Sequence, residues 1–206
     1  MKIEAVLREA RACRACEPAL PLGARPLVQG SASARILVIG QAPGAVAHET
    51  GIPWNDRSGA RLRDWLGLAD EAFYDPAKVA LMPMGFCFPG TGRSGDLAPR
   101  PECAPLWHAR LLRGFRRVGL TVIVGRHAAE RYAIGDAGDD GSITALASAF
   151  DRWLPERIVI PHPSPRNGLW LKRNPWFESR AVPALRRRVA ELLEGRAPGR
   201  APAPSD

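Results

Sequence analysis

The sequence predicts a three-layer α/β/α sandwich, in which helices cover both faces of a central, mostly parallel four-stranded sheet. Short apolar runs that are typical of buried strands alternate with segments of helical periodicity, which is the pattern of this fold class. The chain has 206 residues, of which 46% are apolar, and this suits one domain with a packed core. We expect a single domain over residues 1–194 and a disordered tail over residues 195–206, which are rich in Pro, Ala and Gly.

Four segments are expected to form the sheet. Arg35–Gly40 is a continuous apolar run that ends in glycine, as buried parallel strands often do. The other candidate strands share this apolar character and are Val79–Met82, Leu120–Gly125 and Arg157–Pro161. Ligands of such sheets bind beyond the carboxyl ends of the strands, so the loops that begin at Gly40, Pro83 and Pro161 are expected to carry the chemistry.

Apolar residues at helical spacing predict the covering helices. These segments are Ile3–Ala12, Gly59–Leu66, Cys103–Val118, His127–Tyr132 and Asn174–Leu193. Two Gly- and Pro-rich stretches, Gly40–Ser58 and Phe86–Pro101, are expected to be loops.

The charge balance favours an anionic partner. The chain has 29 basic and 21 acidic residues, a net charge of +8, and such an excess is common in proteins that bind nucleic acid. Arginine bias in the composition is the alternative explanation. No apolar run is long enough for a membrane span, and the first residues lack the apolar segment of a signal peptide. We therefore expect a cytoplasmic protein without membrane contact, and a monomer.

The four cysteines form a pattern. Cys13 and Cys16 give C-x2-C, and Cys87 and Cys103 give C-x15-C after a gap of 70 residues. In a cytosolic chain, four cysteines are more often metal ligands than disulfide partners. A site of four cysteines holds either zinc or an iron–sulfur cluster, and the spacing does not choose between them. Unrelated buried thiols are the remaining alternative.

Two motifs carry a resemblance to a known family. The loop after the first strand reads Gly40-Gln-Ala-Pro-Gly44, and the loop after the last strand reads His162-Pro-Ser-Pro-Arg-Asn167. They resemble motifs A and B of the uracil-DNA glycosylase superfamily. GQAPG is similar to motif A of the iron–sulfur family four enzymes, with Gln41 where those enzymes usually carry Glu. The cysteine pattern is similar to that of families four and five.

The resemblance spans Cys13 to Asn167 and implies a function. It implies a DNA repair glycosylase that hydrolyses the N-glycosidic bond of uracil flipped out of DNA and leaves an abasic site. Its partners would be uracil-containing DNA and the abasic product. It also implies a structural [4Fe–4S] cluster held by Cys13, Cys16, Cys87 and Cys103. A uracil- or abasic-site-binding protein of the same fold with little turnover is the alternative.

Asp56 and His162 are the candidate catalytic residues. Asp56-Arg57-Ser58-Gly59 resembles a tract of the family five enzymes. The best-known branch of the superfamily carries an Asp within motif A, and this sequence has Ala42 at that position. Asp56 would stabilise the sugar cation and activate water, although it could instead cap the following helix. Glu49 is the reserve carboxylate. His162 would donate to uracil O2 or be a structural histidine; the other three histidines are expected at the surface or in packing.

The remaining candidates would hold the base and the DNA. Trp54 would stack on the flipped base, unless it is a core aromatic, and Gln41 and Ala42 would meet the base edge. Met82-Pro83-Met84-Gly85 stands where the superfamily often has a uracil-reading Asn, which leaves base selectivity open. The minor-groove loop would consist of Ser164, Pro165, Arg166 and Asn167, with Arg166 filling the space that the base vacates; a solvated basic turn is the alternative.

Overall fold

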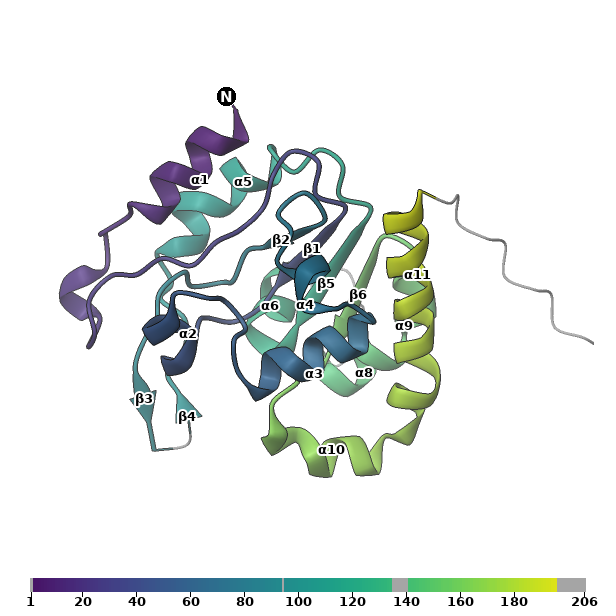
Figure 1. Cartoon of the computed structure of the whole chain (residues 1–206). Helices are drawn as coiled ribbons and strands as arrows, with labels where there is room; N and C mark the ends of the chain where they lie inside the picture. Colours follow the sequence, from purple (N-terminus) through teal and green to yellow (C-terminus); the bar gives the residue numbers. More distant parts are fainter. Residues whose placement is uncertain (1, 94, 135–140, 196–206) are drawn as a thin grey trace, which may run out of the picture.

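A central parallel sheet organises the molecule (Figure 1). The computed structural model describes residues 2–93, 95–134 and 141–195. The sheet has four parallel strands in the order β2-β1-β5-β6. Their bounds are β1 Ile36–Ile39, β2 Val79–Leu81, β5 Leu120–Val124 and β6 Arg157–Ile160. Each predicted strand is therefore confirmed to within two residues at each end.

Both faces of the sheet are covered by helices, which confirms the predicted three-layer fold. Along β1, Leu37 and Ile39 pack in one core with α1 (Ile3–Arg11), α5 (Ala109–Leu112) and α6 (Gly125–Tyr132). Ile36 and Val38 pack in the opposite core with α3 (Arg57–Leu66) and α11 (Val182–Glu194). Successive strand residues point to opposite faces, so a strand that is buried on both faces has an unbroken apolar sequence.

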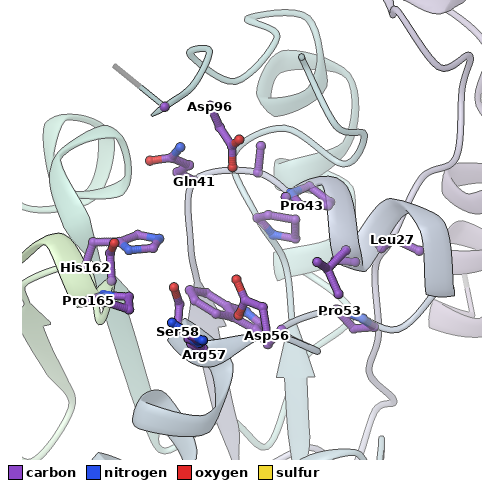
Figure 2. A pocket seen from close by; sticks show the side chains of 18 of the residues that line it. Leu27, Gln41, Pro43, Pro53, Asp56, Arg57, Ser58, Asp96, His162 and Pro165 are labelled. Carbon is purple, nitrogen blue, oxygen red and sulfur yellow. The ribbon is translucent and has the colours of Figure 1, made fainter. Parts of the chain in front are cut away.

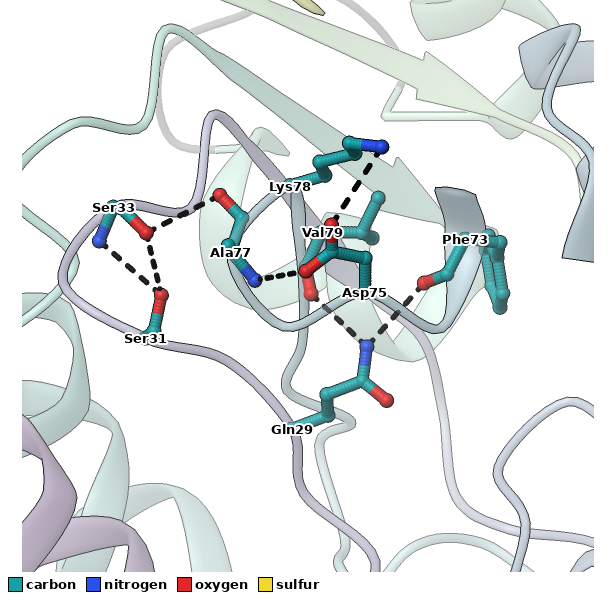
Figure 3. Close-up of polar contacts among 8 residues, drawn as sticks. All are labelled: Gln29, Ser31, Ser33, Phe73, Asp75, Ala77, Lys78 and Val79. Atoms are coloured by element: carbon teal, nitrogen blue, oxygen red, sulfur yellow. Dashed lines mark hydrogen bonds and ion pairs between the residues drawn. The ribbon is translucent and has the colours of Figure 1, made fainter. Parts of the chain in front are cut away.

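Gln29 covers the outer edge of the sheet (Figure 3). Its backbone exchanges two hydrogen bonds with Leu81 of β2, at 3.0 and 2.9 Å. Its side-chain amide donates to the carbonyl oxygens of Phe73 (3.3 Å) and Val79 (3.1 Å). An exposed strand edge invites pairing with other chains, and this segment occupies it. The same segment brings Leu27 to Phe86, whose carbonyl accepts from the Leu27 amide at 2.7 Å.

Several predicted bounds were wrong. The helix predicted over Cys103–Val118 is a wide π-type turn, Ala104–His108, followed by α5, and it ends at Leu112. The chain then passes α1 so closely that a Cβ on Gly114 would lie 2.5 Å from Ile3 Cδ1. The helix predicted from Asn174 begins with a similar turn, Phe177–Ala181, before α11.

Short elements fill segments that were expected to be loops. The predicted loop Gly40–Ser58 contains α2 (Ala45–Thr50), and Phe86–Pro101 contains a hairpin of β3 (Thr91–Gly92) and β4 (Gly95–Asp96). The other unpredicted elements are Glu17–Ala19, α4 Asp70–Phe73, α8 Ile143–Ser148, α9 Phe150–Trp153, Pro165–Asn167 and α10 Gly168–Arg173. The predicted tail lies outside the described residues from 196 onward. In the described ranges, no helix is both long and apolar enough to cross a membrane.

Candidate active site

A cavity of about 760 Å³ lies beyond the carboxyl end of the sheet, where ligands bind in this fold class. Its volume is in the range of small-molecule sites, roughly 300–1,000 Å³. The loops after β1 and β6 form much of its wall. The predicted catalytic, base-binding and DNA-binding residues all line it, namely Gln41, Ala42, Trp54, Asp56, His162, Ser164, Pro165, Arg166 and Asn167.

His162 stands two residues after the end of β6 and is partly buried in the pocket wall. The Asn167 side chain fixes the local backbone, because its Nδ2 donates to the His162 carbonyl oxygen at 2.7 Å. Burial lowers the pKa of His162, and the nearby carboxylates of Asp56 and Asp96 oppose this effect. The lowered pKa favours the neutral imidazole near pH 7, which offers one N–H donor.

Trp54 has an unusual backbone conformation. Its φ is +58°, in the left-handed region that non-glycine residues rarely adopt. The indole lies against Gly40, where a Cβ would be 2.6 Å from Trp54 Cζ2. Its ring centroid is 5.7 Å from that of His162. The aromatic face is thus beside the candidate hydrogen-bond donor, and Trp54 is part of the pocket rather than only of the core.

Asp56 caps α3, as the alternative interpretation proposed. Its Oδ1 accepts a hydrogen bond from the Gly59 backbone amide at 2.7 Å. The residue is exposed and also lines the pocket. A carboxylate has two oxygens with several acceptor positions, so capping through Oδ1 is compatible with a role in the pocket.

The loop after His162 is internally braced. Ser164 Oγ accepts from the Arg166 amide at 3.3 Å, and Arg61 of α3 donates to the Ser164 carbonyl at 3.1 Å. Ser164 and Asn167 therefore shape the loop, whereas Pro165 and Arg166 are exposed at its tip. Sequence reasoning missed Arg61, since nothing in its local sequence indicates a partner about a hundred residues away.

The model of the Uracil DNA glycosylase superfamily matches residues 27–186. The chain belongs to this superfamily. The matched residues include the whole pocket and exclude Cys13 and Cys16. Members of the superfamily act on DNA, so membership supports a DNA glycosylase and leaves the particular substrate to be tested.

The β3–β4 hairpin gives this superfamily member an unpredicted carboxylate. Asp96 lines the pocket, and Figure 2 shows Asp56 and Asp96 pointing into it from opposite sides, with His162 beside them. The hairpin lies close to the first motif, because a Cβ on Gly44 would be 3.3 Å from Asp96 Oδ2. The glycines around Thr91 are the turn signal that could have indicated the hairpin.

A buried histidine supports the pocket wall at Pro83, near the position where the superfamily often has a uracil-reading Asn. Pro83 lines the pocket, and its carbonyl accepts from Nε2 of His108 at 3.1 Å. The other nitrogen of His108 is 2.5 Å from the Tyr132 hydroxyl. Because a carbonyl only accepts, Nε2 carries the proton and Nδ1 accepts from Tyr132. Burial lowers the pKa of His108 to about 4, so this histidine is a neutral packing residue that fixes the pocket wall.

The four cysteines line one small cavity. They are free thiols, and their neighbours there include Leu20, Pro26 and Phe86. The Phe86 amide donates to Cys103 Sγ at 3.5 Å. Burial raises the pKa of Cys87 to about 11 and that of Cys103 to about 12. Among the described residues, however, no group of three or more His, Cys, Asp or Glu side chains is arranged to hold a metal ion. All four cysteines therefore lie on one cavity, while their role as ligands and the metal itself stay predictions.

Proposed function

We propose that this superfamily member is a uracil-DNA glycosylase that removes uracil from DNA as part of base excision repair. The observation that supports this most is the convergence of Trp54, Asp56 and His162 on one cavity, from loops that are about a hundred residues apart. Arg166 is exposed at the rim of the same cavity. An aromatic face, a carboxylate, a neutral donor and a basic tip are the groups that excision of a flipped base requires.

The base would be bound before it is cut. A glycosidic bond inside the duplex is not accessible, so the nucleotide must be extruded into a pocket. The extruded uracil would stack on Trp54, with its edge toward Gln41 and the backbone at Ala42. Arg166 would enter the space that the base leaves, and Ser164, Pro165 and Asn167 would keep the loop in the minor groove.

Cleavage would break the bond between C1′ and N1, with the electron pair leaving on uracil. Neutral His162 would donate a hydrogen bond to O2, where negative charge develops. The Asp56 carboxylate would face the positive sugar and accept a proton from the water that adds to C1′. The uracil anion then takes up a proton from solvent and Asp56 releases its proton to solvent, so that the products are an abasic site and free uracil.

We propose that Cys13, Cys16, Cys87 and Cys103 hold a [4Fe–4S] cluster. Four free cysteines around one largely apolar cavity suit such a cluster, as does the backbone N–H directed at Cys103. Ligand sulfurs of a four-iron cluster lie farther apart than the ligands of one ion, so the lack of a single-ion arrangement among the described residues is compatible with it. The cluster would supply a structural cross-link. The test is the iron and sulfide content of purified protein, compared with Cys103→Ser.

The deciding experiment uses a labelled oligonucleotide with a single uracil and limiting protein, followed by alkaline cleavage of abasic sites. Several turnovers per protein molecule would support the glycosylase. Tight retention of DNA with at most one turnover would overturn it in favour of a uracil- or abasic-site-binding protein. A matched oligonucleotide with thymine controls for non-specific cleavage.

A further inference from the structure

A partly buried arginine lies behind Trp54. The side chain of Arg63, on α3, is only 12% exposed. Its Nη1 donates to the Trp54 carbonyl oxygen at 3.0 Å and lies 3.1 Å from the Tyr74 hydroxyl. That hydroxyl donates to the same carbonyl at 3.4 Å. The backbone of Trp54 is therefore held by two donors that are themselves in contact.

The other contacts of Arg63 fix the direction of its guanidinium. Its Nε is 2.7 Å from Asp70 Oδ1. Its Cζ lies over the rings of Phe73 and Tyr74, at 5.6 and 5.5 Å from their centroids. An ion pair at one edge and aromatic rings against the guanidinium restrict its motion. Its Nη1 is consequently aimed at the Trp54 carbonyl.

Trp54 needs such support. A non-glycine residue in the left-handed region is strained and persists only where its surroundings impose that conformation. Relaxation of its φ would swing the indole away from Gly40 and from His162, which it faces at 5.7 Å. Arg63 has no place on the pocket lining, so any effect on chemistry would pass through Trp54.

We propose that Arg63 is a positioning residue, which with Tyr74 holds Trp54 in its left-handed conformation so that the indole can stack on the extruded base. This inference rests on the proposed function. In this proposal the indole of Trp54 is already in its stacking position before the base arrives. It is held there by Arg63 and its partners, which lie outside the pocket.

The first test compares Arg63→Met with Tyr74→Phe, both of which remove a donor and keep the bulk of the side chain. Single-turnover excision of uracil would be measured in the wild-type and Trp54→Ala backgrounds. Misplacement by about 1 Å can cost up to roughly a hundredfold, so we expect Arg63→Met to slow excision by about tenfold or more. In the Trp54→Ala background the same change should have almost no further effect. An equal loss in both backgrounds would overturn the proposal.

Arg186→Met is the matched control. Arg186 of α11 pairs at 2.9 Å with Asp64 of α3, the helix that carries Arg63. Its side chain is 45% exposed and does not line the pocket. Its substitution should leave the excision rate unchanged. If it slows excision as much as Arg63→Met does, general loosening of α3 is the cause and the proposal fails.

A second measurement does not depend on glycosylase activity. The six tryptophans would be labelled as fluorotryptophan, with the Trp54 resonance assigned by its absence from Trp54→Phe. We expect Arg63→Met and Tyr74→Phe to shift or broaden this resonance more than the other five. An unmoved Trp54 resonance would refute the positioning role even if uracil is excised. A moved resonance in a protein that excises no uracil would instead refute the proposed function alone.

Discussion

Gly59→Ala tests whether the start of α3 sets the pocket. In an ordinary helix this change would stabilise by about 1 kcal/mol, because alanine has the higher helix propensity. At this position the new Cβ would overlap the Trp54 carbonyl oxygen and lie 2.5 Å from its carbonyl carbon. Overpacking of this kind costs about 1–3 kcal/mol, and the obstacle is backbone, which cannot rotate away. Because backbone cannot move aside, we take the upper part of this range, about 2–3 kcal/mol. After the gain of about 1 kcal/mol in helix propensity is subtracted, we expect net destabilisation of about 1–2 kcal/mol, a fall in Tm of roughly 2–8 °C.

The assay is urea unfolding together with single-turnover uracil excision. Gly168→Ala is the matched control, since Gly168 is also helical and a Cβ there would meet nothing within 4 Å. The control should keep or slightly raise stability and keep the excision rate. Excision by Gly59→Ala should fall about tenfold or more, because the indole must move with its backbone. Wild-type stability and excision in Gly59→Ala would refute this account of the site.

Three further changes test individual residues. Asp56→Asn should leave Tm nearly unchanged, because Asn also caps helices, yet slow excision by about a hundredfold or more; a wild-type excision rate would remove Asp56 from the chemistry. His162→Ala should slow single-turnover excision by at least about fivefold, the equivalent of ~1 kcal/mol, and a smaller loss would contradict its role at the leaving group. His108 has a pKa of about 4 in the folded protein, against an ordinary value of 6.5. Below pH 6.5 its imidazole is therefore protonated in the unfolded chain but stays neutral in the folded protein. The free energy of unfolding consequently falls as the pH drops toward 4. Between pH 7 and pH 5 the free energy of unfolding should fall by roughly 2 kcal/mol for this reason. Urea unfolding at both pH values should show a smaller fall for His108→Asn than for the wild type, and equal falls would contradict the role of His108.

The sequence predicted the parts of the fold that have a local signal. The strand Arg35–Gly40 was identifiable because burial on both faces removes polar residues from a short run. The loop from His162 to Asn167 was identifiable because its motif is contiguous. By contrast, the β3–β4 hairpin has two residues in each strand, which is too short for alternation to appear. Asp96 was missed with it, although it enters the pocket.

Helix ends depended on contacts that no local pattern encodes. The segment from Cys103 keeps helical spacing past Leu112, but the helix ends there, and Gly114 then passes too close to Ile3 of α1 to carry a Cβ. His108 was expected at the surface or in packing, since a lone histidine in a helix has no signal for a partner. Its hydrogen bond to the Pro83 carbonyl is a tertiary contact. The cysteines could be grouped from their spacing, whereas the spacing could not identify the metal or cluster that they would hold.

The beginning of α3 unites residues that the sequence had singled out separately. The Gly59 amide holds Asp56 by capping, and the absent side chain of Gly59 leaves room for the Trp54 carbonyl. Arg61 reaches from the same helix to the loop after β6, and Arg63 reaches back to Trp54. The capping role of Asp56 therefore does not compete with a catalytic one. The cap fixes the carboxylate relative to the same helix that positions the stacking face and the DNA-facing loop, so one rigid element sets the relative placement of all three.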